Sequence, residues 1–160
     1  SQRFFDRVYK SRGIELEASL RMNEFFLNGG LTWTDAEISK DDISPANEGN
    51  TPRRQADVVY QLTGGYAAAN WTVGANVIGT SDAYAQDNNQ LVMPGYTQVN
   101  LFADYRFAEN WVVGLNVNNL FDTFGITESE EGGIVANTEN IIRARSIPGR
   151  TASLSVRYEF

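Results

Sequence analysis

The chain has 160 residues and a net charge of −7, and it contains neither cysteine nor histidine. The two missing residue types exclude disulfides, thiolate metal sites and the commonest zinc ligand, general base and sulfur nucleophile, and the negative charge argues against a nucleic-acid partner. We therefore expect no enzyme activity, no cofactor and no metal site. No run of about 18 apolar residues is present, so no transmembrane helix is predicted, but strands that cross a membrane need only alternation.

The first two predicted strands are residues 13–22 and 25–35, and a tight turn at Asn23 and Glu24 separates them. In both segments apolar and polar side chains alternate, and a period of two predicts strands with one apolar and one polar face. Apolar residues between positions 4 and 9 precede the first strand without a turn signal. This pattern predicts one long strand rather than two. A long polar loop, 39–53, follows the second strand.

The same scheme then occurs twice more and ends in a single strand. The expected strands are 55–68 and 71–79, 98–107 and 111–118, and finally 151–160. Short turns join the members of each pair, whereas long loops at 81–95 and 124–149 separate the pairs. The sequence therefore predicts an all-β, antiparallel up-and-down meander of about seven strands.

Each short turn is followed directly by an aromatic residue: Phe25, Trp71 and Trp111. A meander places its short turns at one end, so these rings are expected at one level. Short turns, long loops and a level of aromatic residues are typical of transmembrane β-barrels, whose strands alternate between lipid and lumen. A soluble sugar-binding β-sandwich and a small independent outer-membrane barrel remain the alternatives. Seven strands cannot close a barrel that needs an even number, which favours a segment of a larger barrel.

Four short motifs occur in the chain: SRGIELE at 11–17, PGYTQVN at 94–100, NVNNLFD at 116–122 and RYEF at 157–160. In this order they resemble motifs of the TonB-dependent outer-membrane receptor family, with Asn100 where an aspartate is usual. The third motif contributes the residues Asn116, Asn118, Asn119, Leu120, Phe121 and Asp122. Its asparagines and aspartate are expected to bond nearby backbone at a strand end.

The resemblance implies that residues 1–160 are the C-terminal segment of a 22-stranded barrel in the bacterial outer membrane, with the plug domain and earlier strands absent. It implies active import of a scarce nutrient, by default a ferric siderophore, with energy delivered through TonB. The implied partners are outer-membrane lipid, the remaining barrel and plug, the TonB complex (through the absent N-terminal part), the barrel-assembly machinery and a small-molecule ligand. Segments 125–128 and 147–150 look more like the carbohydrate-importing branch, so an oligosaccharide remains an alternative ligand.

The candidate ligand contacts lie in or beside the long loops. Aromatic rings there can stack on a siderophore or sugar ring, and polar side chains beside them can donate or accept hydrogen bonds. The candidates are Tyr84, Asp87, Asn88, Tyr96, Phe124 and Arg53. The loop carboxylates lack the spacing of an EF-hand and are interpreted as solvated. The resemblance also implies an assembly signal in the last strand, formed by Leu154, Val156, Tyr158 and Phe160.

Overall fold

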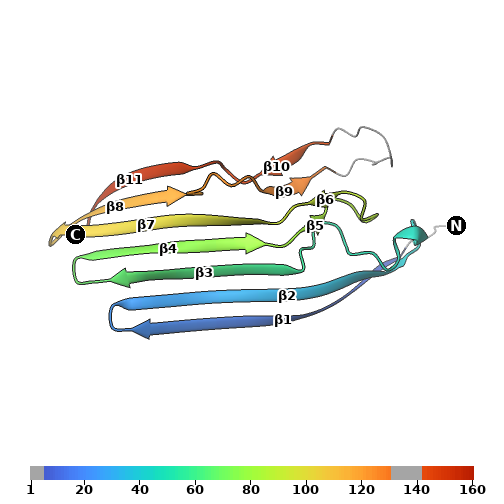
Figure 1. Cartoon of the computed structure of the whole chain (residues 1–160), viewed down its shortest axis with the longest axis horizontal. Coiled ribbons are helices and arrows are strands. Elements are labelled where there is room, and N and C mark those ends of the chain that lie inside the picture. The colour runs from blue at the N-terminus through green and yellow to red at the C-terminus, as the bar shows by residue number, and fades with distance from the viewer. Residues whose placement is uncertain (1–5, 131–141) are drawn as a thin grey trace.

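The computed structural model describes residues 6–130 and 142–160, which form one curved antiparallel sheet (Figure 1). The seven strands of this sheet lie in the spatial order β1 (Arg7–Met22), β2 (Phe25–Asp41), β3 (Val58–Ala67), β4 (Trp71–Thr80), β7 (Tyr96–Ala108), β8 (Trp111–Asn118) and β11 (Thr151–Tyr158). Every strand pairs antiparallel with the next one along this order, so the predicted meander is confirmed. No helix in the described part of the chain is long and apolar enough to cross a membrane.

The long loops contain small elements that the sequence pattern did not predict. These are the 3₁₀ turn η1 (Pro45–Asn47) and two hairpins, β5 (Ala83–Tyr84) with β6 (Val92–Met93) and β9 (Ile126–Ser129) with β10 (Ala144–Ser146). Figure 1 shows that these elements and the three long loops lie together at one end of the sheet, the loop end. The three short turns lie at the opposite end, the turn end.

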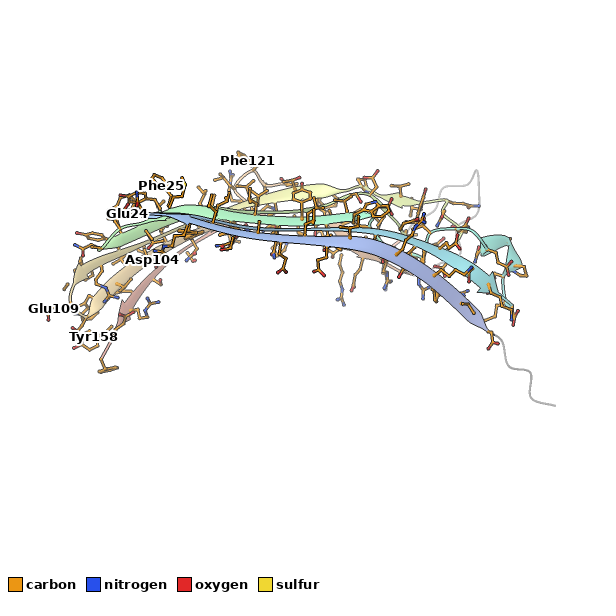
Figure 2. All side chains as sticks on the ribbon, turned by 90° about the horizontal axis from the view of Figure 1, so that it is seen from below. Glu24, Phe25, Asp104, Glu109, Phe121 and Tyr158 are labelled. Carbon is orange, nitrogen blue, oxygen red and sulfur yellow. The ribbon has the colours of Figure 1, made fainter. Side chains whose placement is uncertain are left out.

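The register places apolar side chains on one face across all seven strands. Leu16 lies opposite Leu31, Leu62 opposite Val77, and Leu115 opposite Leu154. The sheet is arched, with Phe25 on its convex side and Asp104 on its concave side (Figure 2). The convex face is therefore apolar and the concave face polar, as expected for the wall of a barrel.

This apolar face is exposed rather than packed in a core. Leu16, for example, is 60% exposed and Leu154 is 72% exposed. Among the described residues, the buried apolar side chains are few and sit mainly at the loop end: Ile38, Ala85, Met93 and Val112. A soluble protein rarely exposes an apolar surface of this extent, whereas lipid covers it at no cost. The sheet therefore contradicts the β-sandwich alternative.

Aromatic rings line the turn end on the convex face. Ring centroids are 4.8 Å apart between Phe25 and Tyr66 and 5.0 Å apart between Tyr66 and Trp71. On β8 and β11, Trp111 and Tyr158 are also 5.0 Å apart. The three rings that follow the short turns thus belong to one belt, as the sequence predicted. Rings of this kind anchor a barrel at the membrane interface.

The first hairpin is longer than a membrane requires. β1 has 16 residues and β2 has 17, whereas about 9–11 residues cross a bilayer. β1 is one continuous strand from Arg7, as predicted. The prediction also placed residues 4 and 5 in this strand, and these two lie outside the described residues. β2 continues six residues past the predicted end at Asp35 and stays paired with β1 as far as Arg7. Charged pairs cross the two strands there, Arg12 to Asp35 at 2.8 Å and Lys10 to Glu37 at 3.9 Å.

Candidate ligand-binding rim

Three connections form the loop end: the first loop (42–57), the second loop (81–95) and the third loop (119–150), whose described part excludes 131–141. We call their described residues the loop rim. The side-chain amide of Asn89 joins the second loop to the first by pairing with the backbone of Thr51, as one strand pairs with another. The Thr51 N–H donates to Asn89 Oδ1 at 2.9 Å, and Asn89 Nδ2 donates to the Thr51 carbonyl at 2.7 Å. Asn89 adopts a φ of 55°, which asparagine tolerates well.

Asp87 forms the centre of the same seam. Its Oδ1 accepts the backbone N–H of Arg53 at 2.9 Å, and its carbonyl accepts Asn50 Nδ2 at 2.9 Å. Its Oδ2 lies 2.9 Å from Arg7 Nη1 on β1. Asp87 is only 9% exposed. The carboxylate that the sequence marked as a ligand contact is therefore engaged in holding the first loop, the second loop and β1 together.

Arg7 joins this seam to a second carboxylate, at the end of β2. Arg7 Nη2 lies 2.7 Å from Asp41 Oδ2, and Asp41 is completely buried. Asp41 Oδ1 also accepts the backbone N–H groups of Ile43 and Ser44 at 3.1 and 3.0 Å. Burial alone would raise the pKa of Asp41, but the hydrogen bonds from Ser44, Arg7 and Ile43 outweigh it and hold the pKa below 3.8. Asp41 therefore stays ionised at neutral pH.

The order of the first loop is expected to be lost only in acid. Because the pKa of Asp41 is lower in the folded protein than its ordinary 3.8, ionised Asp41 stabilises the fold above that value, and this contribution disappears as the pH falls through the lower folded pKa. A nitroxide at the exposed position Ile43 should have constant mobility from about pH 5 to 9 and become mobile below about pH 4. Asp41→Asn should make the label mobile throughout; a transition near neutral pH would contradict this assignment.

The third loop joins the rim through Arg54 and Ser129. Arg54 Nη2 donates to the Ser129 carbonyl at 2.6 Å, and the backbone N–H of Arg54 donates to the Tyr84 carbonyl at 2.7 Å. The Ser129 hydroxyl in turn donates to the Ala85 carbonyl at 3.4 Å. Ala85 and Ser129 are both buried. All three loops therefore meet at this junction.

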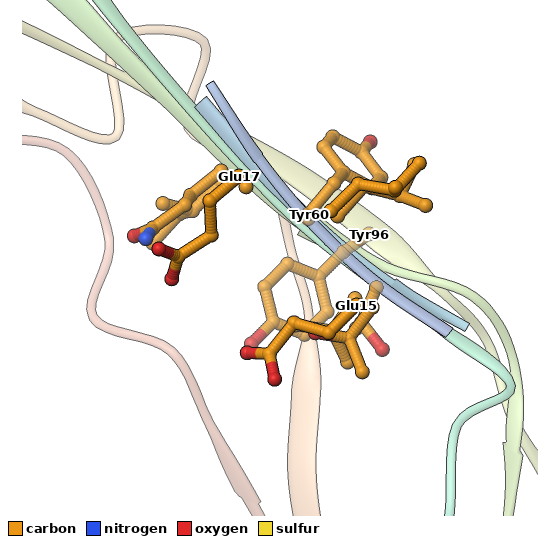
Figure 3. A pocket seen from close by; sticks show the side chains of 13 residues that line it. Glu15, Glu17, Tyr60 and Tyr96 are labelled. Carbon is orange, nitrogen blue, oxygen red and sulfur yellow. The ribbon is translucent and has the colours of Figure 1, made fainter. Parts of the chain in front are cut away.

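Below the rim, the concave face offers a polar wall. A depression of about 280 Å³ is lined on this side by side chains that include Glu15, Glu17, Gln61 and Tyr96. Figure 3 shows Glu15, Glu17 and Tyr96 on one side of the sheet and Tyr60 on the opposite side. Tyr96 packs against the third loop so closely that a Cβ at Gly125 would lie 2.5 Å from its ring. Carboxylate, amide and phenol groups here can form hydrogen bonds with a polar solute.

The six candidate contacts fall into two groups. Tyr84, Asp87, Asn88 and Arg53 gather at the seam of the first and second loops, where Asn88 Oδ1 accepts the Gln90 N–H at 3.1 Å. Tyr96 and Phe124 lie at the base of the third loop. The ring of Tyr96 packs against Gly125, and Phe124 directly precedes Gly125 in the sequence. Phe124 is 74% exposed. The sequence pattern did not mark Arg7 or Ser129, which form bonds to Asp87 and Arg54 in the loop rim.

The NVNNLFD segment forms a braced turn at the end of β8. Asn119 is 1% exposed, and its Oδ1 accepts the Thr123 N–H at 2.8 Å. Its Nδ2 donates to the carbonyls of Thr123 and Pro148, both at 2.9 Å. Asp122 Oδ1 accepts the Arg150 N–H at 2.8 Å, directly before β11. The two side chains thus set the path of the chain from β8 toward the last strand.

A ladder of neutral side chains connects this turn to the polar wall. Asn76 Nδ2 donates to Thr63 Oγ1 at 2.9 Å, and Asn100 Nδ2 donates to Asn76 Oδ1 at 3.1 Å. Asn100 Oδ1 accepts the Asn119 N–H at 2.9 Å. An ionised aspartate at position 100 has no donor for Asn76. Asn100, where the family usually has an aspartate, therefore supplies the donor for the Oδ1 of Asn76 on β4.

The arched sheet, its exposed apolar face and its aromatic belt define a wall of an outer-membrane β-barrel. The chain belongs to the TonB-dependent receptor family: the family described as TonB dependent receptor-like, beta-barrel, matches residues 1–120. Members of this family are outer-membrane proteins, which confirms the predicted location. The long loops of such barrels are extracellular and the short turns periplasmic, so the loop rim lies at the cell surface.

A known relative supports the same family assignment, and solved structures share the fold. The metal-pseudopaline receptor CntO of Pseudomonas aeruginosa is 32% identical over a 119-residue alignment that covers 71% of this chain and 17% of CntO. The siderophore receptor PiuA from Acinetobacter baumannii superposes with a TM-score of 0.82 at 22% identity, covering 95% of this chain and 22% of PiuA. The ferric yersiniabactin uptake receptor FyuA from Yersinia pestis also gives 0.82, at 18% identity, covering 96% and 24%. The chain therefore spans less than a quarter of the length of these proteins.

Proposed function

We propose that this chain is part of a receptor that imports a chelated metal, by default a ferric siderophore, across the outer membrane. The observation that supports this proposal is the loop rim at the cell-surface end of a polar wall. There the Arg53 N–H bonds to Asp87, next to Asn88, and the following Arg54 N–H bonds to the Tyr84 carbonyl. Aromatic and amide groups together suit a flat, oxygen-rich chelate. The relatives named for metal-pseudopaline and siderophores support this class of ligand.

In this receptor, transport would require a plug domain and the TonB complex as partners. A plug domain would fill the barrel against the polar wall, and the TonB complex would supply the energy to move it. In this arrangement the chain itself binds and guides the solute and carries out no chemical reaction. Within the described residues, no group of three or more carboxylates is arranged to hold a metal ion. The metal is therefore proposed to arrive and leave inside its chelator.

Uptake by cells carrying the full-length gene tests the proposal. Cells expressing the receptor would be given iron-55 as ferric citrate or as a ferric tris-catecholate, and, in parallel, carbon-14 maltodextrin. We expect uptake of at least one iron complex, abolished by deletion of TonB, and no uptake of the oligosaccharide. TonB-dependent uptake of the oligosaccharide without either iron complex would contradict the proposal and favour the carbohydrate alternative.

We also propose that the last strand carries the assembly signal. Leu154, Val156 and Tyr158 share the convex face, and the ring of Phe160 lies 5.1 Å from that of Tyr158. Phe160→Ala in the full-length receptor is expected to lower the amount of folded barrel in the outer membrane several-fold. Phe160→Tyr, which keeps the ring, should restore it. Equal folded amounts for the alanine and tyrosine variants, judged by heat-modifiable electrophoresis, would rule out this role.

A further inference from the structure

Arg54 has a position in the loop rim that ligand import alone does not explain. It belongs to the first loop, yet its backbone N–H donates to the Tyr84 carbonyl of the second loop and its guanidinium donates to the Ser129 carbonyl of the third. We propose that Arg54 is the positioning residue that holds the three loops in one preformed arrangement and so orients Tyr84 for the ligand. The effect on ligand rests on the proposed function; the effect on loop geometry does not.

The backbone at Arg54 shows that this arrangement is imposed on the residue. Its φ is 59°, in the left-handed region that residues with a Cβ rarely adopt. Such conformations persist where the surroundings fix them, and they occur often at binding sites. The two neighbouring bonds, Arg53 N–H to Asp87 Oδ1 and Arg54 N–H to the Tyr84 carbonyl, fix it here.

The Arg54 guanidinium donates its hydrogen bond to a carbonyl, that of Ser129, in a buried residue. Ser129 is 2% exposed, so its carbonyl has little access to water. A buried carbonyl without a donor is costly, and a charged donor gives a stronger hydrogen bond than a neutral one. The Ser129 hydroxyl continues the connection to Ala85, which directly follows Tyr84. Removing the guanidinium therefore breaks the bond between the first and third loops, and the long Ser129–Ala85 bond of 3.4 Å remains between the third loop and the segment that carries Tyr84.

A preformed rim has a consequence for binding. Loops that are already held together lose less conformational freedom when a ligand binds, and affinity rises accordingly. Loss of the Arg54 side chain should weaken capture of the ligand and leave the later transport step unchanged. The half-saturation concentration for uptake should then rise while the maximal rate and the amount of folded receptor stay the same.

The variants separate the side chain from the backbone. Arg54→Gly permits the left-handed backbone that bonds to Tyr84 and removes the whole side chain, the guanidinium included. Arg54→Lys keeps a donor for the Ser129 carbonyl. Arg12→Gln is the matched control, because Arg12 is an exposed arginine at the loop end that bonds to Asp35 within the first hairpin.

The experiment uses the full-length receptor with nitroxides at two exposed positions, Gln90 in the second loop and Glu128 in the third. Double electron–electron resonance should give one narrow distance distribution for the unsubstituted receptor, Arg12→Gln and Arg54→Lys, and a broad one for Arg54→Gly. With iron-55 ferric citrate and ferric tris-catecholate as probes, Arg54→Gly should raise the half-saturation concentration roughly tenfold at an unchanged maximal rate.

Each result decides between alternatives. A narrow distribution in Arg54→Gly would overturn the proposal, and so would a broad distribution with an unchanged half-saturation concentration. If the unsubstituted receptor takes up neither iron complex but Arg54→Gly still broadens the distribution, chelate import fails while the role of Arg54 in loop geometry stands.

Discussion

Leu62→Arg is expected to prevent assembly of the full-length receptor in the outer membrane. Leu62 is on β3 and faces the convex side, opposite Gly29 on β2 and Val77 on β4. It lies four residues from Tyr66 in the aromatic belt, which places it near the middle of the bilayer. A cation at this depth costs about 2–4 kcal/mol. Heat-modifiable electrophoresis of outer membranes should show little folded receptor.

The neighbouring residue provides the control. Gln61 lies on the same strand, is exposed like Leu62, and points to the concave face. Gln61→Arg should therefore give nearly normal amounts of folded receptor. If Gln61→Arg abolished assembly and Leu62→Arg did not, the two faces would be assigned the wrong way round.

Asn119→Ala is expected to be the most destabilising polar substitution in this segment. It leaves the Thr123 N–H and the carbonyls of Thr123 and Pro148 without their buried partner. It also places alanine at a φ of 51°, which asparagine accepts more readily. Each unsatisfied buried group costs about 1–3 kcal/mol, so a loss of about 3 kcal/mol or more is expected. Urea unfolding of the receptor in lipid vesicles measures it.

Asn118→Ala tests whether burial, rather than asparagine itself, is responsible. Asn118 is exposed and its side chain makes one long hydrogen bond, 3.4 Å to Thr151 Oγ1. We expect a change within about 0.5 kcal/mol. Equal losses for the two alanine variants would show that the bonds of Asn119 do not brace the turn.

The strands and their faces could be predicted because each depends on a local pattern. Alternation over 13–22 and 71–79 marks the strands, and the register then follows from keeping every apolar side chain on one face. The position of Phe25, Trp71 and Trp111 directly after short turns predicted the belt for the same reason. β7 begins at Tyr96, inside the PGYTQVN motif that resembles a strand start in the family.

The loop rim could not be predicted in the same way because its contacts join distant residues. Arg7 and Asp87 are 80 positions apart, and Arg54 and Ser129 are 75 apart. Asp87 looks like any solvated loop carboxylate in the sequence, and only the fold brings it to Arg7. β3 likewise begins at Val58 rather than residue 55, and the Gln55 N–H bonds to the Pro52 carbonyl in a local turn instead of pairing with β2.

The two edge strands of the sheet are β1 and β11. Among the described strands, β1 and β11 each pair on one side only. An unpaired strand edge cannot stay in lipid, because its backbone groups have no partners there. Both edges are therefore expected to pair with further strands of the complete barrel. That the chain is a segment within a larger barrel stays a prediction.

Site-directed spin labelling along β4 tests the central claim most directly, namely that the convex face of this sheet meets lipid. Single nitroxides would be placed at successive positions from Thr72 to Ile78 of the full-length receptor in outer-membrane vesicles. We predict a period of two in collision with oxygen, with maxima at Val73, Ala75 and Val77 and low collision with a water-soluble nickel chelate at the same positions. Oxygen maxima at Thr72, Asn76 and Ile78, or no alternation, would contradict the account.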